Sequence, residues 1–254
     1  MTSAVAAIGV DVGSTTWKAV AIDAQGQVLA RRVEPAHPRI EDQTTRLLAE
    51  LEKELGCGGA PVGATGYGRK RVKAARSLTE ITCHARGAWK LAARPCVLVD
   101  MGGQDTKIIR IGAGGEVKDF AMNDKCAAGT GRFLEVILSR LHVPFDEVHP
   151  LVSKAQKPVA VSSTCTVFAE SEVISLVAQG EPVEGIVAGM LQSLAKRVAA
   201  LAGVLPEGPV LMSGGVARNR AMVEALGAAL RRTVEVLPEP QTVGALGAAL
   251  STLA

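Results

Sequence analysis

The sequence has few aromatic residues and no long run of one charge, and both absences limit what it can bind. Phe, Trp and Tyr make up 3% of its 254 residues, so little is present that could stack on nucleic-acid bases. Lys and Arg exceed Asp and Glu by only 28 − 25 = 3 residues. Arg69–Arg71 is a short basic exception that we interpret as a solvated loop. The sequence therefore predicts no binding to nucleic acid.

Export and membrane signals are also missing. Met1–Gly9 has neither a basic start nor a small-residue cleavage site, and we interpret it as a strand rather than a signal peptide. No apolar run approaches the roughly 18–20 residues of a membrane span. We therefore expect a cytoplasmic protein that does not bind membranes.

Cysteine is present but does not follow the pattern of a disulfide framework. The five residues, at irregular spacing, are Cys57, Cys83, Cys96, Cys126 and Cys165. An odd count in a cytosolic chain favours buried thiols or metal ligands over disulfides. Cys57 and Cys96 are expected to be small buried residues, and the role of Cys83 stays open. Because no Cys-x-x-Cys or paired His occurs, nothing supports a zinc site.

An internal repeat organises the chain. The segment Asp11–Lys18 resembles Asp100–Lys107 at an offset of 100 − 11, about 89 residues, and the offset persists without a gap to Ile22 and Ile111. Each copy predicts a strand, an Asp-x-Gly turn, a second strand and a glycine turn into a third. The first predicted strand is Ala6–Val10 in one copy and Cys96–Val99 in the other. The second is Ala19–Ile22 in one copy and Ile108–Ile111 in the other. A matched hairpin behind both turns predicts two similar lobes.

The remaining pattern is that of an α/β chain. Apolar residues at helical spacing predict helices, and a short apolar run predicts a buried strand at 210–213. The predicted helices are 41–55, 184–202, 219–231 and 242–253. We expect one lobe over 1–95, joined by the C-terminal helix in 240–254, and a second lobe over 96–239.

The Asp-x-Gly hairpins suit phosphate. Glycine lets the backbone approach closely, and the small residues that follow offer N–H and hydroxyl donors. The aspartate can hold Mg²⁺ through water. Two such hairpins, one per lobe, would hold a triphosphate from both sides. The candidate residues are Asp11, Gly13, Ser14, Thr15 and Thr16 in the first copy, and Asp100, Gly102, Gly103 and Gln104 in the second.

A third segment completes the nucleotide pattern. A strand ending at Ser213 is followed by Gly214 and Gly215 before a helix, which leaves room for a flat adenosine. This three-part pattern resembles the superfamily of actin, sugar kinases and heat-shock chaperones. No Gly-Lys pair occurs, so a Walker A loop is absent. Gly129 and Gly131 have no third glycine in register and do not form a dinucleotide fingerprint, but we include them among the nucleotide-binding candidates.

Two cysteine segments stand out. Cys126 lies in Asn123–Phe133 and Cys165 in Ser162–Glu172, and a helical pattern follows each. Both thiols are expected at or just before helix N-termini, where free N–H groups stabilise negative charge on a cluster's sulfurs. Two cysteines cannot ligate a four-iron cluster, which needs four thiolates, but two chains across a two-fold axis could. A buried structural role stays the alternative.

At these residues the sequence resembles a known family, the BadF/BadG/BcrA/BcrD-type ATPases. It looks like the ATP-dependent activator (component A) of 2-hydroxyacyl-CoA dehydratases. The matching stretches span nearly the whole chain, and the long ones, Met122–Phe133 and Val161–Ser175, are highly specific. The resemblance implies a homodimer in which Cys126 and Cys165 of both subunits hold one 4Fe–4S cluster.

The resemblance also implies an activity. An electron from ferredoxin or flavodoxin would reach the cluster, and ATP hydrolysis would drive it to a separate iron–sulfur enzyme that acts on a CoA thioester. Gln104 is the candidate for positioning the attacking water, with Asp11 and Asp105 as the nearby carboxylates. Open alternatives are an ATPase subunit of benzoyl-CoA reductase, the reductase of a double-cubane protein, a small-molecule kinase and a chaperone-like ATPase. The acyl-CoA and the electron donor are not identified by the sequence.

Overall fold

The computed structural model describes residues 4–163 and 165–253. Its strands are β1 Ala7–Val12, β2 Thr16–Ile22, β3 Val28–Pro35, β4 Val62–Thr65, β5 Arg76–Ser77, β6 Cys96–Met101, β7 Thr106–Ile111, β8 Val117–Asn123, β9 Val210–Ser213 and β10 Val234–Val236. Its α-helices are α1 Ile40–Glu54, α2 Glu80–Ala92, α3 Gly131–Arg140, α4 Val148–Val152, α5 Thr166–Ala178, α6 Val183–Ala202, α7 Arg220–Leu230 and α8 Val243–Leu250. The chain therefore has the predicted α/β composition.

The two sheets have the same topology. In the described residues, one has the order β3-β2-β1-β4-β5 and the other, taken in the matching direction, β8-β7-β6-β9-β10. β1 pairs antiparallel with β2 and parallel with β4, and β6 pairs parallel with β9. The predicted offset holds, since β1 and β6 begin 96 − 7 = 89 residues apart and β3 and β8 begin 117 − 28 = 89 apart. The duplication read from the sequence is confirmed.

The chain divides into two compact units. The first consists of Met1–Pro95, Arg110–Asp119 and Leu237–Ala254, and the second of Cys96–Ile109 and Phe120–Val236. The segment Arg110–Asp119 comes from the middle of the chain, and a Cβ on its Gly115 would lie 3.0 Å from the Trp89 Cβ of the first unit. The ranges 1–95 and 96–239, as functional lobes, stay a prediction.

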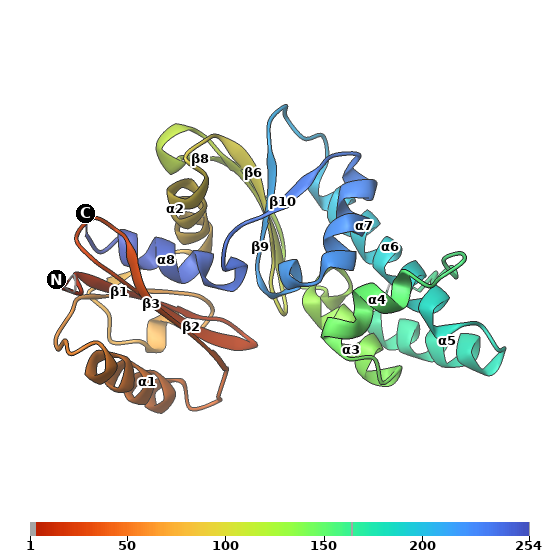
Figure 1. Ribbon diagram of the computed structural model, residues 1–254, viewed down its shortest axis with the longest axis horizontal. Helices are drawn as coiled ribbons and strands as arrows, with labels where there is room; N and C mark the ends of the chain where they lie inside the picture. Colours follow the sequence, from red (N-terminus) through yellow and green to blue (C-terminus); the bar gives the residue numbers. More distant parts are fainter. Residues whose placement is uncertain (1–3, 164, 254) are drawn as a thin grey trace. The chain divides into compact units, whose positions relative to one another are not determined.

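Helices cover both faces of the first sheet (Figure 1). Leu47 and Leu51 of α1 pack with Ile8 and Val10 on one face. Ala245 and Ala249 of α8 lie in a separate cluster on the other. This inside-out alternation along β1 follows from the period of two in a strand, which sends successive side chains to opposite faces. Asp11 is thereby placed at the end of a strand that is buried along its whole length.

Glycine sets the distance between α2 and α8. A Cβ on Gly247 would overlap the carbonyl oxygen of Cys83, so the two helices meet backbone to backbone at this point. We predict that Gly247→Ala lowers the free energy of unfolding by about 3 kcal/mol, because the clash is with main chain that cannot rotate away. Urea denaturation followed by tryptophan fluorescence measures this, since both tryptophans, Trp17 and Trp89, lie in the first unit.

Gly58→Ala is the matched control for that prediction. Nothing lies within 4 Å of a Cβ at Gly58, so its stability should stay within about 1 kcal/mol of the parent. Equal stability of the two variants would show that α2 and α8 do not need this contact.

The second unit has the larger core. Val97 and Val99 of β6 pack with residues of α3, α6 and α7, among them Phe133, Met190 and Met222. The predicted strand 210–213 is confirmed as β9, and the predicted helix 184–202 as α6. The predicted helix 242–253 is shorter than expected and ends at Leu250.

α6 bears on the expectation about membrane spans. Within residues 4–163 and 165–253, it is the helix long and apolar enough to cross a membrane by length and composition: 20 residues, with a mean hydropathy of 1.2 over its best 18-residue window. It is not a continuous apolar run, since Glu184, Lys196 and Arg197 interrupt it. Because 56% of that window is buried inside the protein, and Ile186, Met190 and Leu194 lie in the core, α6 has the features of a core helix.

Candidate functional site

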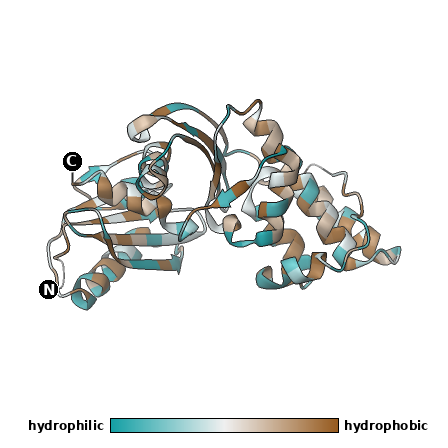
Figure 2. Ribbon diagram, turned by 45° about the horizontal axis from the view of Figure 1, so that its top comes forward, coloured by the Kyte–Doolittle hydropathy of each residue, from teal (hydrophilic) through white to brown (hydrophobic). Residues whose placement is uncertain are grey.

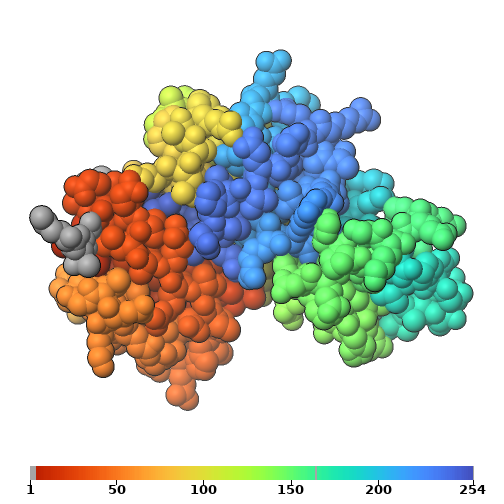
Figure 3. All heavy atoms as spheres, viewed as in Figure 1, coloured from red at the N-terminus to blue at the C-terminus, as the bar shows by residue number. Residues whose placement is uncertain are grey.

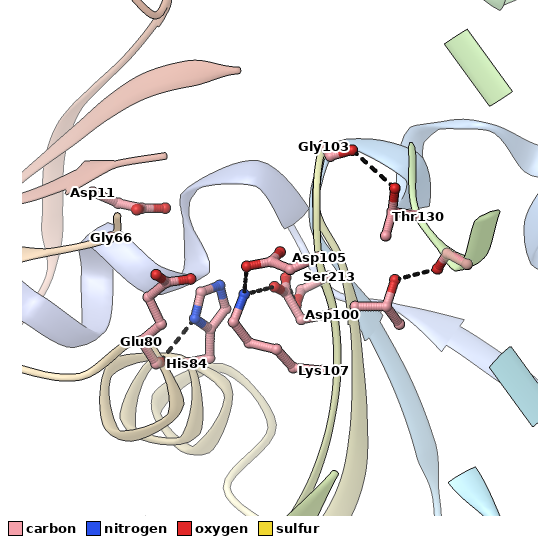
Figure 4. Close-up of polar contacts among 12 residues, drawn as sticks. Asp11, Gly66, Glu80, His84, Asp100, Gly103, Asp105, Lys107, Thr130 and Ser213 are labelled. Atoms are coloured by element: carbon pink, nitrogen blue, oxygen red, sulfur yellow. Dashed lines mark hydrogen bonds and ion pairs between the residues drawn. The ribbon is translucent and has the colours of Figure 1, made fainter. Parts of the chain in front are cut away.

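A buried charge cluster lies behind the second Asp-x-Gly turn (Figure 4). Asp100, at the end of β6, is 3% exposed and accepts a hydrogen bond of 2.7 Å from the Ser213 hydroxyl at the end of β9. The Lys107 ammonium lies 3.5 Å from Asp100 Oδ2 and 2.7 Å from Asp105 Oδ2. Lys107 itself is 2% exposed. The buried Lys107 ammonium therefore forms ion pairs with two carboxylates, one on each side of the turn.

The first copy contains the same pair in simpler form. The Lys18 ammonium lies 3.1 Å from Asp11 Oδ2, and Asp11 is 4% exposed. These two pairs correspond, because 100 − 11 and 107 − 18 both equal 89. The residue equivalent to Asp105 is Thr16, so only the second copy has the additional carboxylate. Neither lysine was predicted to have a role. The sequence signal that could have indicated one is that each lysine ends its copy of the repeated segment.

The two turns are tight hairpins. The Gly13 N–H donates to the Thr16 carbonyl over 3.0 Å, and the Gly102 N–H donates to the Asp105 carbonyl over 2.9 Å. Ser14, Thr15 and Gln104 are exposed at the tips, where their polar groups face outward. The candidate residues at the tip of each hairpin are thus together and accessible, as a phosphate site requires, whereas Asp11 and Asp100 are buried behind them.

Glycines from distant segments surround Asp11. A Cβ on Gly66 would lie 2.5 Å from Asp11 Oδ1, and Gly66 has φ +92°, which favours glycine. A Cβ on Gly244 would lie 3.3 Å from Asp11 Oδ2 and 2.8 Å from the ring of His84. His84 is buried, with Nδ1 2.9 Å from the Glu80 carbonyl of its own helix. Sequence reasoning missed these neighbours, since they follow Asp11 by 55 residues or more.

The predicted Gly-Gly turn follows β9. Gly214 has φ +89°, and a Cβ there would overlap the Met101 carbonyl at the end of β6. Glycine is therefore required where β9 ends beside the Asp100 turn. Gly215 begins the 3₁₀ turn Gly215–Arg218, and α7 starts after it.

The segment after Cys126 is bonded directly to the second Asp-x-Gly turn. The Gly131 N–H donates to the Gly102 carbonyl over 2.9 Å. The Gly103 carbonyl accepts from the Arg132 N–H at 2.7 Å and from the Thr130 hydroxyl at 3.1 Å (Figure 4). The N-terminus of α3 is thus held on the turn that would bind phosphate.

A second contact reinforces that attachment. The Thr106 hydroxyl, at the start of β7, donates to the Gly129 carbonyl over 2.7 Å. Gly129 and Gly131, included as nucleotide-binding candidates, therefore use their backbone groups to join the cysteine segment to the Asp-x-Gly turn. A displacement of that turn would carry the Cys126 segment with it.

The two predicted cluster cysteines are both exposed. Cys165 caps the N-terminus of α5, as expected. Cys126 precedes only the 3₁₀ turn Ala127–Gly129, and α3 begins at Gly131. Cys126 therefore lies just before a helical segment, as expected, and α3 itself begins five residues later. Extended Thr130 caps α3 by accepting the Arg132 N–H on its side chain, which fixes the start of this helix.

The backbone around each cysteine is firmly held. The Asn123 amide donates to the Cys126 carbonyl over 2.8 Å and accepts the Cys126 N–H over 3.2 Å. Ahead of Cys165, the Glu172 carboxylate accepts from the Ser162 N–H and hydroxyl and from the Ser163 N–H, at 2.7–2.8 Å. Burial acts to raise the pKa of Glu172, but these hydrogen bonds prevail and lower it to about 2.

The other cysteines differ. Cys96 and Cys83 are buried, but Cys57 is half-buried, which corrects the expectation for that residue. Burial raises the pKa of the Cys83 thiol to about 11, so this thiol is a poor metal ligand at neutral pH. Within the described part of the chain, no three His, Cys, Asp or Glu side chains are grouped to hold a metal ion.

α5 carries apolar side chains at its surface. Val167 and Phe168 are 68% and 67% exposed, and Ile174 and Val177 are also exposed. Figure 2 colours much of this helix as hydrophobic, and Figure 3 shows its residues at the surface beside those of α3. Exposed apolar residues gathered next to Cys165 are typical of a contact surface.

Comparison with known proteins gives a consistent assignment. The model of the BadF/BadG/BcrA/BcrD ATPase family matches residues 8–252. The activator of lactoyl-CoA dehydratase from Anaerotignum propionicum is 42% identical over 252 residues, which cover 96% of this chain and 95% of the relative.

Solved structures agree with this. The activator of the 2-hydroxyisocaproyl-CoA dehydratase from Clostridium difficile, with bound ADPNP, superposes with a TM-score of 0.89 at 38% identity, covering 97% of this chain and 94% of the other. A ROK family glucokinase from Streptomyces griseus superposes with a TM-score of 0.63 at 16% identity, over 97% and 98% of the two chains. The latter likeness shows the fold alone and confirms the predicted sugar-kinase-like architecture.

Proposed function

The chain belongs to the BadF/BadG/BcrA/BcrD ATPase family, and from that premise we propose that it is the ATP-dependent activator of a 2-hydroxyacyl-CoA dehydratase. In this role it hydrolyses ATP and passes a low-potential electron to a separate iron–sulfur enzyme. The relatives that match the full length of the chain support this, since they include an activator of lactoyl-CoA dehydratase.

The nucleotide binds at the Asp-x-Gly turns. N–H groups and hydroxyls of Gly13–Thr16 and Gly102–Gln104 donate to phosphate oxygens, and Gly214 and Gly215 leave room for the adenosine. Asp11, Asp100 and Asp105 are the carboxylates that would hold Mg²⁺. Gln104, exposed at its turn, orients the attacking water, because an amide can direct a water molecule without being a strong base.

The observation that carries the proposal is the attachment of the Cys126 segment to the second Asp-x-Gly turn. Four hydrogen bonds join them, from the N–H groups of Gly131 and Arg132 and the hydroxyls of Thr106 and Thr130. A change at the phosphate-binding turn is therefore transmitted to Cys126 through short, directional contacts. This is what coupling ATP hydrolysis to an electron carrier requires.

The two cysteines fit half of an iron–sulfur site. Both thiols are exposed and free of disulfides, and Cys165 lies at the N-terminus of a 13-residue helix whose dipole favours negative charge. A 4Fe–4S cluster needs four thiolates and supplies one-electron transfer when bound. A second copy of the chain, meeting the first through the exposed apolar residues of α5, supplies the other two. The chain thus acts as a homodimer.

The electron partners follow from this role. Ferredoxin or flavodoxin reduces the protein in the cytoplasm, and the dehydratase accepts the electron. The alternative acceptor is a benzoyl-CoA reductase or a double-cubane protein. A small-molecule kinase of the same fold would instead phosphorylate a metabolite and bind no iron.

Anaerobic single-turnover electron transfer tests the proposal. The reduced protein is mixed with MgATP and a purified 2-hydroxyacyl-CoA dehydratase, and oxidation of the activator is followed by its visible absorbance. We expect transfer that needs ATP, is not supported by ADP, and falls at least 100-fold in Asp100→Asn, since that variant weakens the Mg²⁺ contacts. Transfer at the same rate without nucleotide would contradict the coupling, and phosphorylation of an added sugar would favour the kinase.

A further inference from the structure

Arg197 joins the two cysteine segments. It lies in the last two turns of α6, and its guanidinium carbon is 4.9 Å from the centre of the Phe133 ring. Nη1 donates to the Ala128 carbonyl over 2.9 Å, and Nη2 donates to the Ser163 carbonyl over 2.8 Å. Each acceptor is two residues from a cysteine, since 128 − 126 and 165 − 163 both equal 2.

An arginine suits this pair of contacts better than a lysine. The guanidinium is a rigid planar fork that holds two acceptors at a set spacing, whereas lysine is a single point of charge on a flexible stem. The Phe133 ring, itself fully buried, supports one face of the fork. The distance between the Ala128 and Ser163 carbonyls is therefore set by the geometry of one group.

The Ser163 peptide is anchored from the other direction as well. Its N–H donates to the Glu172 carboxylate of α5 over 2.7 Å, while its carbonyl accepts from Arg197. On the other segment, Asn123 holds the peptide groups of Cys126. Arg197 is the group that links these two anchored segments.

The charge of Arg197 also lies close to Cys126. Both residues line a cavity of about 520 Å³, together with Lys125 and Asn123. Burial lowers the pKa of Arg197. Arginine nevertheless remains charged at any physiological pH. A partly desolvated cation beside a thiolate stabilises added negative charge there.

We propose that Arg197 is a positioning residue for the electron-transfer centre: it fixes the spacing of the Cys126 and Cys165 segments, and its charge raises the reduction potential of the centre that they hold. The effect on the reduction potential rests on the proposed function, whereas the effect on the spacing of the two segments is a property of the chain alone. The two effects separate because Arg197→Lys keeps the charge and loses the fork, whereas Arg197→Met loses both.

Hydrogen exchange on the metal-free full chain tests the spacing. We expect backbone amides in 126–131 and 161–163 to exchange at least tenfold faster in both variants than in the parent, with unchanged protection in α1. Arg220→Met, on α7, is the matched control, because that arginine is exposed and its guanidinium pairs with Glu224 of its own helix. Unchanged exchange in both Arg197 variants would overturn the positioning role.

Redox titration of the anaerobically purified protein tests the charge. At a fixed solution potential, Arg197→Met should lower the ratio of reduced to oxidised centre about tenfold, which for one electron is about 59 mV. Arg197→Lys should stay within twofold of the parent. An unchanged ratio in Arg197→Met would overturn the electrostatic role. If the parent itself holds no iron, the proposed function fails, whereas the exchange experiment still decides whether Arg197 holds the two segments.

Discussion

Replacing either Cys126 or Cys165 by alanine is expected to abolish iron binding and leave nucleotide binding intact. Each chain offers two exposed thiols for a centre that needs four, so each substitution removes two ligands from a dimer. The hydrogen bonds that tie the Cys126 segment to Gly102 and Gly103 come from the N–H groups of Gly131 and Arg132 and from the Thr130 hydroxyl, which substitution of a cysteine leaves in place. Iron and sulfide assays, with ATP binding by calorimetry, measure both properties.

Cys57→Ala is the matched control for these variants. Cys57 is half-buried and lies in the first unit, away from the segments of Cys126 and Cys165 along the chain. It should keep the iron content of the parent. Iron at the parental level in Cys126→Ala or Cys165→Ala would refute the ligand assignment, and loss of ATP binding in them would show that the substitutions damage the fold.

Replacing Lys107 by methionine is expected to destabilise the second unit severely. The ammonium is 2% exposed and compensates Asp100, which is almost completely buried, and Asp105 (Figure 4). Methionine fills similar space but leaves both carboxylates without this cation. Removing one partner of a buried ion pair costs about 3–5 kcal/mol. Urea denaturation followed by far-UV circular dichroism measures the loss, since the tryptophans report only on the first unit.

The duplication provides an internal comparison for Lys107. Lys18→Met removes the corresponding cation of the first copy, which pairs with Asp11 and has no counterpart of Asp105. Its loss of stability should be smaller. Adding Asp105→Asn to Lys107→Met should restore part of the stability, because one carboxylate is then neutral. A Lys107→Met protein as stable as Lys18→Met would show that the buried cluster contributes nothing beyond a simple pair.

The duplicated hairpins could be predicted because their signals are local. Each strand and its partner lie within about 25 residues of each other, and they are marked by alternating apolar residues, an Asp-x-Gly turn and a glycine turn. The same signals occur again 89 residues later. The buried strand β9 and the core helix α6 were predicted for the same reason, since each is bounded by glycine or proline within its own segment.

What could not be predicted depends on contacts between distant residues. Arg197 and Ala128 are separated by 69 positions, and nothing near Arg197 in the sequence indicates that it points to a cysteine segment. The burial of Lys107 is equally hidden, because a lysine after a turn is normally solvated. The exact start of α3 could not be predicted either, because it depends on capping by Thr130 and on the bonds to Gly102 and Gly103.

The coupling expected from these contacts has a limited size. A typical coupling free energy of about 1–3 kcal/mol corresponds to roughly 40–130 mV for one electron. A larger fall in potential would require a further contribution from docking to the acceptor enzyme.

The number of irons per chain in protein purified without oxygen tests the central claim most directly. Native mass spectrometry, combined with iron and sulfide analysis, gives both the oligomeric state and the metal content. A homodimer with about four irons and four sulfides for every two chains is the expected result. A monomer that carries no iron, or a complete four-iron cluster on every chain, would contradict a centre shared between Cys126 and Cys165 of two subunits.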